Sequence, residues 1–325
     1  MSETRNREAT DDAPLSTSKN SDAVDEATAA LVEPKGDTLI GRTVTINRPR
    51  AELYAYWRDF TNLASFMSEM NQANESIARD AHTERPSLAG RRAIITGGTT
   101  GIGRAIAVLL ASEGVKVFIC GRTAQHLDDA LERIRQVGDG DGIGIDLARR
   151  ENVETFFQAA DSYLGGLDIA VINAAVPAEG LDDTDEDTLD YQIAVDFASY
   201  LTSTKASLKR LKAGSDVVLI GSMSAVSQSA GTSVYVAAKT GIEGFAHALR
   251  QEMADKDVKI GLIEPGFTGA DFQYPEFPPE KQRELIHEAK MLRAEDIAVA
   301  VHFMLAQPRR TAVSLMRVET RRKHP

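Results

Sequence analysis

Two residues in the stretch TSVYVAAKTG, Tyr235 and Lys239, have a spacing at which a phenol and an ammonium could act on one ligand. The small residues around them favour a helix, and positions i and i+4 of a helix share one face. An ammonium so placed would favour the phenolate, lower the pKa of the tyrosine and allow proton transfer near neutral pH. Tyr-x-x-x-Lys also occurs by chance on ordinary helices, so the pair needs support from the rest of the chain.

A glycine-rich turn in the stretch ITGGTTGIGRAIAVLLASEG has the form of a phosphate-binding turn. Gly97 permits a tight turn, Gly101 lets the backbone come close to a pyrophosphate, and Gly103 allows close packing of helix on strand. The free N–H groups and partial positive charge of the following helix N-terminus favour an anion. Because the turn lies between a β-branched run and an amphipathic segment, it predicts a dinucleotide-binding site.

Short apolar or β-branched runs, separated by amphipathic segments of helical length, must position these residues. The runs cover residues 91–96, 115–120, 142–145, 167–172, 216–221, 258–263 and 312–318. Several are apolar almost throughout, as in strands of a sheet that is covered on both faces. We therefore predict an α/β fold: a Rossmann-like, doubly wound, seven-stranded parallel sheet with helices on both faces. Right-handed crossovers would gather the C-terminal ends of the strands, and with them the motifs, at one edge.

From about residue 88 to residue 318 the chain resembles the short-chain dehydrogenase/reductase (SDR) family. After the glycine turn come IDLA, INAAV, IGSMSA, the Tyr-x-x-x-Lys pair and Pro-Gly, with Ser222 at the family's usual spacing of thirteen residues before Tyr235. The resemblance implies an oxidoreductase that interconverts a carbonyl and a secondary alcohol by hydride transfer. Tyr235 would be the general acid/base, Lys239 would lower its pKa and hold the nicotinamide ribose, and Ser222 would orient the carbonyl.

The resemblance also implies a cofactor site and a fourth catalytic position. The cofactor residues would be Gly97, Thr99, Thr100, Gly101, Ile102, Gly103, Arg122, Thr123, Asp146, Leu147, Asn173, Tyr235, Lys239, Pro265, Gly266 and Thr268. The fourth catalytic position of the family is an asparagine that holds a proton-relaying water, and here it is Asp196. Its negative charge should raise the pKa of Tyr235 and shift optimal turnover toward higher pH. Ala174, Val176 and Ala270 also depart from the family pattern, which leaves the contacts there open.

The choice of nicotinamide cofactor depends on the stretch FICGRTAQ, after the second run. An acidic residue there would bind the ribose 2′-hydroxyl of NAD and repel a 2′-phosphate. The chain instead has Gly121, Arg122 and Thr123, and a guanidinium makes charge-assisted hydrogen bonds to phosphate. We therefore expect NADP rather than NAD. A non-catalytic, NADP-binding sensor or scaffold with the same fold is the alternative function, and it is favoured only by Asp196 and the altered INAAV motif.

The N-terminal part of the chain differs from the rest in composition. Residues 1–37 hold nine Asp or Glu against four Lys or Arg and few large apolar groups, which predicts a disordered acidic tail. Residues 38–87 predict a strand and an amphipathic helix that resemble the start of the START-like polyketide cyclase and lipid-transfer superfamily. Too little of that superfamily is present for its cavity, so we expect a truncated remnant that docks on a neighbouring surface. Residues 88–325 would form the catalytic domain.

Composition limits the partners and the location of the protein. The formal net charge of −11 argues against a nucleic-acid-binding surface, and no apolar run has the length of a membrane span. With no secretory signal, we expect a cytoplasmic protein with a small-molecule substrate and no membrane or nucleic-acid partner. The single cysteine, Cys120, and the scattered histidines predict no metal. The SDR resemblance implies a homodimer or homotetramer, and the aromatics Phe272, Tyr274 and Phe277 would form either a substrate lid or a seal on the core edge.

Overall fold

A seven-stranded sheet forms the centre of the fold. The computed structural model describes residues 86–177, 180–270 and 277–322, all of which belong to the compact unit Arg85–Pro325. Every strand pairs in parallel with its neighbours, in the order β3-β2-β1-β4-β5-β6-β7. The strands are β1 (Arg92–Ile95), β2 (Lys116–Gly121), β3 (Gly140–Gly144), β4 (Ile169–Ile172), β5 (Ser215–Ile220), β6 (Val258–Pro265) and β7 (Leu315–Val318). The predicted Rossmann-like fold is therefore confirmed.

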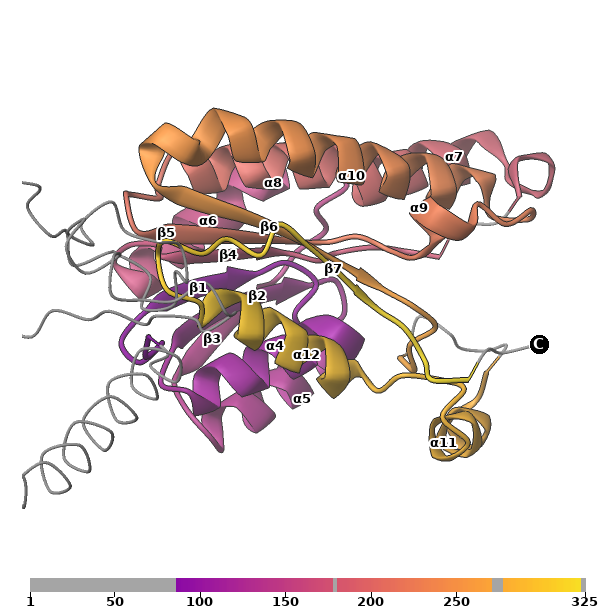
Figure 1. The fold of residues 1–325 in the computed structure, drawn as a ribbon, viewed down its shortest axis with the longest axis horizontal. Helices are drawn as coiled ribbons and strands as arrows, with labels where there is room; N and C mark the ends of the chain where they lie inside the picture. The colour runs from indigo at the N-terminus through magenta and orange to yellow at the C-terminus, as the bar shows by residue number, and fades with distance from the viewer. Residues whose placement is uncertain (1–85, 178–179, 271–276, 323–325) are drawn as a thin grey trace, which may run out of the picture. The chain divides into compact units, whose positions relative to one another are not determined.

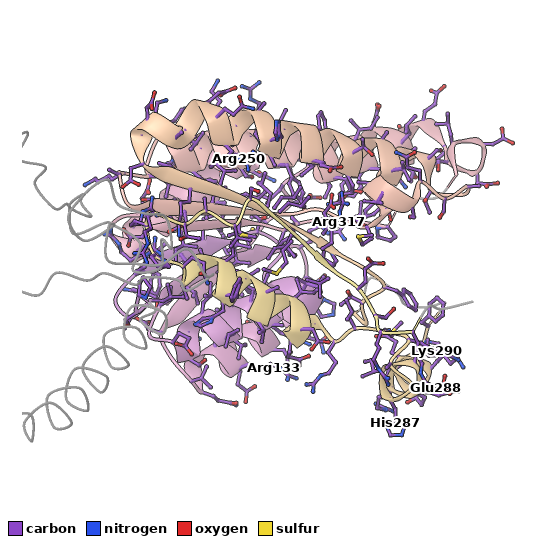
Figure 2. All side chains as sticks on the ribbon, in the orientation of Figure 1. Arg133, Arg250, His287, Glu288, Lys290 and Arg317 are labelled. Carbon is purple, nitrogen blue, oxygen red and sulfur yellow. The ribbon has the colours of Figure 1, made fainter. Side chains whose placement is uncertain are left out.

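Helices cover both faces of the sheet (Figure 1). One layer contains α4 (Gly101–Ser112), α5 (Ala124–Arg135) and α12 (Ala294–Leu305), and the other contains α6 (Arg150–Leu164), α8 (Ser199–Leu208) and α10 (Ser233–Met253). Shorter helices lie in the connections: η1 (Leu181–Asp183), α7 (Glu186–Ile193), α9 (Ser224–Ser227), η3 (Ala254–Lys256) and α11 (Pro279–His287). A π-helical turn, η2 (Ala194–Ala198), joins α7 to α8. Charged side chains project from both layers, among them Arg133 from α5 and Arg250 from α10 (Figure 2).

Two apolar clusters, one on each face of the sheet, make up the core. Successive strand residues alternate between them, as in β1, where Ile94 packs toward α6 while Ala93 and Ile95 pack toward α4 and α12. Both faces are thus buried, which explains the nearly continuous apolar runs in the sequence. Each fully buried aliphatic side chain contributes about 1.5 to 3 kcal/mol of transfer free energy. The rigid sheet gives the loops at its C-terminal edge a fixed base.

At the opposite, N-terminal edge of the sheet, a cluster of cations surrounds the buried carboxylate of Asp216. Asp216 lies in β5, and its side chain is 4% exposed. Arg91 contacts it at 2.7 Å, Arg309 at 3.2 Å and Lys259 at 3.3 Å. These partners come from segments far apart in the sequence, so the cluster joins the start of β1 to β5, β6 and the segment before β7.

Several expectations fall outside the described residues. They are the acidic tail of residues 1–37, the START-like strand and helix of residues 38–87 except for the last two residues, and the aromatic residues Phe272 and Tyr274. Within the described part of the chain, no helix is long and apolar enough to cross a membrane. The same residues contain no group of three or more His, Cys, Asp and Glu side chains able to hold a metal ion.

Candidate active site

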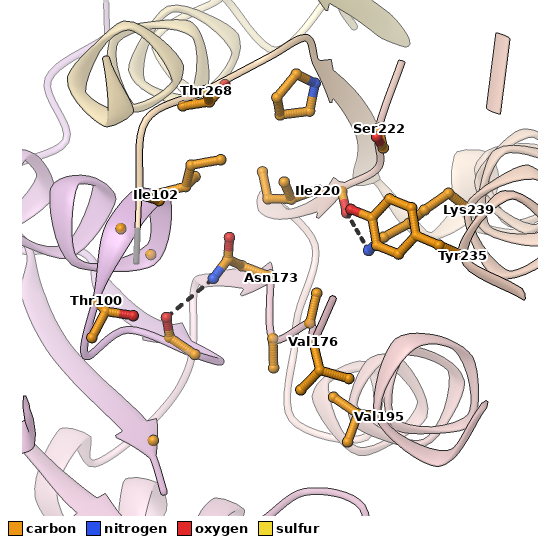
Figure 3. A pocket seen from close by; sticks show the side chains of 18 of the residues that line it. Thr100, Ile102, Asn173, Val176, Val195, Ile220, Ser222, Tyr235, Lys239 and Thr268 are labelled. Atoms are coloured by element: carbon orange, nitrogen blue, oxygen red, sulfur yellow. Dashed lines mark hydrogen bonds between the residues drawn. The ribbon is translucent and has the colours of Figure 1, made fainter. Parts of the chain in front are cut away.

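A cavity of about 590 Å³ opens at the C-terminal edge of the sheet and contains nearly every residue expected from sequence. Figure 3 shows the glycine turn with Thr100 and Ile102 on one side, Ser222, Tyr235 and Lys239 on the other, and Asn173 between them. All sixteen of the predicted cofactor residues line this cavity, as does Ser222. Asp196 does not line it. The topology thus brings motifs from the ends of six strands together at one edge, as Rossmann-like sheets do.

The glycine turn has the geometry expected of a phosphate cradle. Gly97 and Gly101 have φ of +63° and +48°, in the left-handed region that favours glycine. A Cβ at Gly103 would lie 2.1 Å from the carbonyl oxygen of Gly97, so α4 begins closer to the strand than any side chain allows. Thr100, the N-cap residue of α4, makes no side-chain cap hydrogen bond, and the first turn of the helix holds no acidic residue. The first residues of α4, Gly101, Ile102 and Gly103, line the cavity, so the free N–H groups at the start of this helix are available to an anion there.

Asn173, after β4, supports the turn from below. Its Nδ2 donates to the carbonyl oxygens of Thr96 at 3.0 Å and Gly97 at 3.1 Å, and its own N–H donates to Thr96 Oγ1 at 2.8 Å (Figure 3). One amide side chain thus joins the end of β4 to the end of β1. These hydrogen bonds hold the glycine turn against the end of β4.

The Tyr-Lys pair lies at the start of α10, on the face that looks into the cavity. Lys239 is only 1% exposed. Its Nζ donates to Tyr200 Oη at 3.0 Å and to the carbonyl oxygen of Ile220 at 3.4 Å, and lies 5.4 Å from the centre of the Tyr235 ring. Burial lowers the pKa of Lys239 to about 8, although the negative charge of Asp196 opposes this change.

The pKa of Tyr235 moves in the direction opposite to the one expected. It is raised above its ordinary value, first by burial and then by the negative charge of Asp196, while a hydrogen bond from Ser222 opposes the change. The Lys239 ammonium donates to Tyr200 and to Ile220. The lowering of the Tyr235 pKa by Lys239 stays a prediction, and the charge of Asp196 acts on this pKa in the expected direction.

Asp196 lies behind the cavity wall in the π-helical turn η2. It is 1% exposed, and its Oδ1 accepts the N–H of Val176 at 2.8 Å, while no hydrogen-bond partner reaches Oδ2 among the described residues. Burial raises its pKa to about 6, with Lys239 and the Val176 hydrogen bond acting against that change. The negative charge of Asp196 favours the protonated forms of both Tyr235 and Lys239. π-Helical turns of this kind often mark functional sites.

Tyr200 belongs to this buried group, although sequence reasoning missed it. The side chain is fully buried, and its hydroxyl donates to the carbonyl oxygen of Ile220 at 2.8 Å while it accepts from Lys239. The Lys239 ammonium also lies 4.4 Å from the centre of the Tyr200 ring, within cation–π range. The available signal was its position four residues after Asp196, on the same helical side.

Polar side chains gather at the other end of the cavity, beyond β2 and β3. Arg122 and Thr123 follow β2, and Asp146 follows β3. Arg122 Nη1 donates to Tyr191 Oη at 2.5 Å, and Tyr191 Oη donates to Asp146 Oδ2 at 3.1 Å. Tyr191 and His126, which also line the cavity, were not predicted from sequence. Nothing in the spacing of Tyr191 signals this contact, because its partners lie 45 and 69 residues away.

The loop after β6 closes the remaining side. The carbonyl oxygen of Pro265 accepts the N–H of Met223 at 2.9 Å, and Thr268 Oγ1 donates to the carbonyl oxygen of Gly266 at 2.9 Å. Phe267, which lines the cavity, packs edge-to-face on Phe277 with ring centres 5.1 Å apart. Phe277 therefore supports the cavity wall from outside.

The residues present fit a nicotinamide dinucleotide. Glycines leave a cradle that a Cβ would fill, a helix N-terminus faces it, a guanidinium lies at one end, and a serine, a tyrosine and a lysine lie at the other. This is the arrangement of a dinucleotide-dependent enzyme of the Rossmann type. The cavity thus combines a glycine turn of phosphate-binding geometry with side chains whose chemistry suits proton transfer.

Comparison with known proteins identifies the family. The family model for short chain dehydrogenases matches residues 91–281, and the chain belongs to this family. Dehydrogenase/reductase SDR family member 4 from Pongo abelii is 30% identical over 244 residues, which cover 71% of this chain and 86% of that protein. NADPH-dependent aldehyde reductase 1, chloroplastic, from Arabidopsis thaliana is 29% identical and covers 67% and 79% of the two chains. A crystal structure of a short chain dehydrogenase from Burkholderia cenocepacia in complex with NADP superposes with a TM-score of 0.65 at 27% identity, covering 72% of this chain and 98% of the other. The chain therefore belongs to a family of oxidoreductases.

Proposed function

We propose that the protein is an NADP(H)-dependent oxidoreductase that interconverts a carbonyl and a secondary alcohol. The observation that carries the proposal is that Ser222, Tyr235 and Lys239 line the same cavity as the glycine turn. A carbonyl substrate in that cavity would lie within reach of a hydroxyl pair and a buried ammonium. No other arrangement of proton-transferring groups in the described residues shares a cavity with a phosphate cradle.

Each of the three side chains has a distinct part in the proposed reaction. The nicotinamide, when bound, supplies or accepts the hydride. In the reductive direction negative charge develops on the carbonyl oxygen, and Tyr235 donates its proton to that oxygen while Ser222 holds the oxygen by a hydrogen bond. The phenolate that results is stabilised by the positive charge of Lys239, which also offers N–H donors to the nicotinamide ribose.

Three observations support NADP over NAD. At the end of β2, Thr99 lies 2.2 Å from where the Cβ of Gly121 would be, so this position has no room for the acidic side chain that NAD enzymes use. The next residue, Arg122, lines the cavity and offers a guanidinium to a 2′-phosphate. In addition, the Burkholderia relative binds NADP and the Arabidopsis relative is named as NADPH-dependent.

The experiment that tests the proposal compares Tyr235→Phe with the wild type in NADPH oxidation over a panel of aldehydes and ketones. Loss of the general acid should lower kcat/KM by about 10²- to 10⁴-fold while NADPH binding, followed by fluorescence, is kept. A wild-type protein that binds NADPH but turns over none of the carbonyls would favour the alternative, a non-catalytic sensor or scaffold. Asp196 in place of the family's asparagine is the observation on that side.

We extend the proposal to the setting of the enzyme. The family resemblance supports a homodimer or homotetramer that acts on a small carbonyl or alcohol, and the sequence, in which we find no secretory signal, supports a cytoplasmic location. Residues 88–325 would carry the activity, and the preceding segments 1–37 and 38–87 would not take part in catalysis. Analytical ultracentrifugation of the full chain measures the oligomeric state directly.

A further inference from the structure

The cluster of Arg122, Tyr191 and Asp146 brings three elements together at one end of the cavity. Arg122 follows β2, Asp146 follows β3, and Tyr191 lies on α7. The hydroxyl of Tyr191 is bonded to both of the others, at 2.5 Å and 3.1 Å. Tyr191 is therefore the only bridge between the guanidinium and the carboxylate among the hydrogen bonds of these three residues.

The chemistry of the three groups fixes the direction of both hydrogen bonds. A guanidinium only donates, and an ionised carboxylate only accepts. The single proton of the phenol must therefore point to Asp146, which leaves an oxygen lone pair for Arg122. Asp146 is itself held in place, because its other oxygen accepts the N–H of Ala148 at 3.0 Å. The orientation of the phenol is thus determined by the backbone after β3.

We propose that Tyr191 determines cofactor specificity by holding the Arg122 guanidinium in place for a 2′-phosphate. The inference rests on the proposed function, because only NADP carries that phosphate. Arg122 is an exposed residue, and a free arginine would lose rotamer entropy on binding, whereas one already anchored loses less. The bond to Tyr191 occupies one N–H donor of the guanidinium and leaves others for phosphate oxygens.

The geometry around the guanidinium supports the same ligand class. Thr123, the N-cap residue of α5, makes no side-chain cap hydrogen bond, so its hydroxyl and the N-terminus of this twelve-residue helix lie next to Arg122 in the sequence. Thr123 and His126, the latter in the first turn of α5, line the cavity. A dianionic phosphate here would meet a fixed cation, a hydroxyl and backbone N–H groups together.

The test uses two nucleotides that differ only in the 2′-phosphate: adenosine 2′,5′-bisphosphate and adenosine 5′-monophosphate. Their dissociation constants are measured by calorimetry with the full-length wild type and with Tyr191→Phe, which removes only the hydroxyl. We expect the preference for the bisphosphate to fall about 3- to 10-fold in the variant, as for the loss of one hydrogen bond, while affinity for the monophosphate stays within about twofold.

Tyr163→Phe is the matched control. The hydroxyl of Tyr163 donates to Asp139, and Lys116 Nζ lies 4.1 Å from its ring centre, so it also joins an aspartate and a cation. It does not line the cavity. This variant should bind both nucleotides as the wild type does, and thermal unfolding of both variants verifies that they are folded.

The outcomes separate the inference from the function on which it rests. A wild type that prefers the bisphosphate and a Tyr191→Phe variant that keeps the full preference would overturn the role of Tyr191 and leave the NADP proposal standing. An equal loss of affinity for both nucleotides would also overturn the role of Tyr191, because such a result would mean that its hydroxyl contacts the adenosine they share. A wild type without any preference would overturn the NADP proposal and the inference together.

Discussion

At the scale of single residues, the charge of Asp196 has the widest effect on the proposed chemistry. Above about pH 6 this carboxylate is ionised, and its charge raises the pKa of both Tyr235 and Lys239. In Asp196→Asn both pKa values should fall, so the protonated Tyr235 needed for carbonyl reduction is lost at a lower pH. We expect the basic limb of the pH profile of kcat/KM for reduction to move toward lower pH in the variant.

The same measurement contains its own control at low pH. Below about pH 6 Asp196 is protonated and neutral in the wild type, so the two profiles should converge there. Asparagine keeps an oxygen that can accept the N–H of Val176, and the fold should therefore be retained. Coincident basic limbs in the two proteins would show that the charge of Asp196 does not change the pKa of Tyr235.

At the scale of elements, the contact between α4 and the end of β1 depends on the absence of a side chain at Gly103. A methyl group there would lie 2.1 Å from the Gly97 carbonyl oxygen and 2.6 Å from Asn173 Nδ2, so the helix must move away from the strand. Gly103→Ala should lower the free energy of unfolding by about 1 to 3 kcal/mol and weaken NADPH binding at least about tenfold. Urea unfolding and NADPH fluorescence measure the two effects.

Gly144, at the end of β3, provides the matched control for that substitution. Its Cβ would meet no atom within 4 Å, and its φ is not positive. Gly144→Ala should therefore change stability by less than about 0.5 kcal/mol and leave NADPH binding unchanged. If Gly103→Ala bound NADPH as well as Gly144→Ala does, the close approach of α4 to the strand would not be what shapes the phosphate cradle.

The sequence predicts those features that leave a pattern in neighbouring residues, and it does not predict contacts between segments that are far apart in the chain. Strands buried on both faces gave apolar runs, and the glycine turn and the Tyr-Lys pair gave fixed spacings, so their placement at one sheet edge followed from topology. Of the predicted strand 312–318, only the last four residues form β7 at the edge of the sheet. Tyr191 and Tyr200 could not be predicted, because their contacts depend on how α7 and α8 pack across the π-helical turn.

At the scale of the whole molecule, the C-terminal and N-terminal edges of the sheet carry different groups of charged side chains. The C-terminal edge holds the cavity and, in or beside it, the buried groups Lys239 and Asp196, whose pKa values are shifted; Asp196 Oδ2 has no hydrogen-bond partner among the described residues. The N-terminal edge holds the cation cluster around Asp216. The Asp216 cluster is thus kept apart from the charges proposed to take part in catalysis, so substitutions in this cluster should leave the cavity unchanged.

The Asp216 cluster provides a direct test of that separation. Asp216→Asn leaves Arg91, Lys259 and Arg309, which are 21%, 12% and 37% exposed, close together without their shared carboxylate. Because these cations keep some contact with water, we expect a loss of about 2 to 3 kcal/mol in the free energy of unfolding, below the cost for a fully buried pair. Urea unfolding measures this loss, and the KM for NADPH should not change.

Asp129→Asn is the control: it breaks exposed ion pairs instead and should lower the free energy of unfolding by about 1 kcal/mol or less. Equal losses in the two variants would show that the cluster at the N-terminal edge stabilises the sheet no more than an ordinary surface ion pair does.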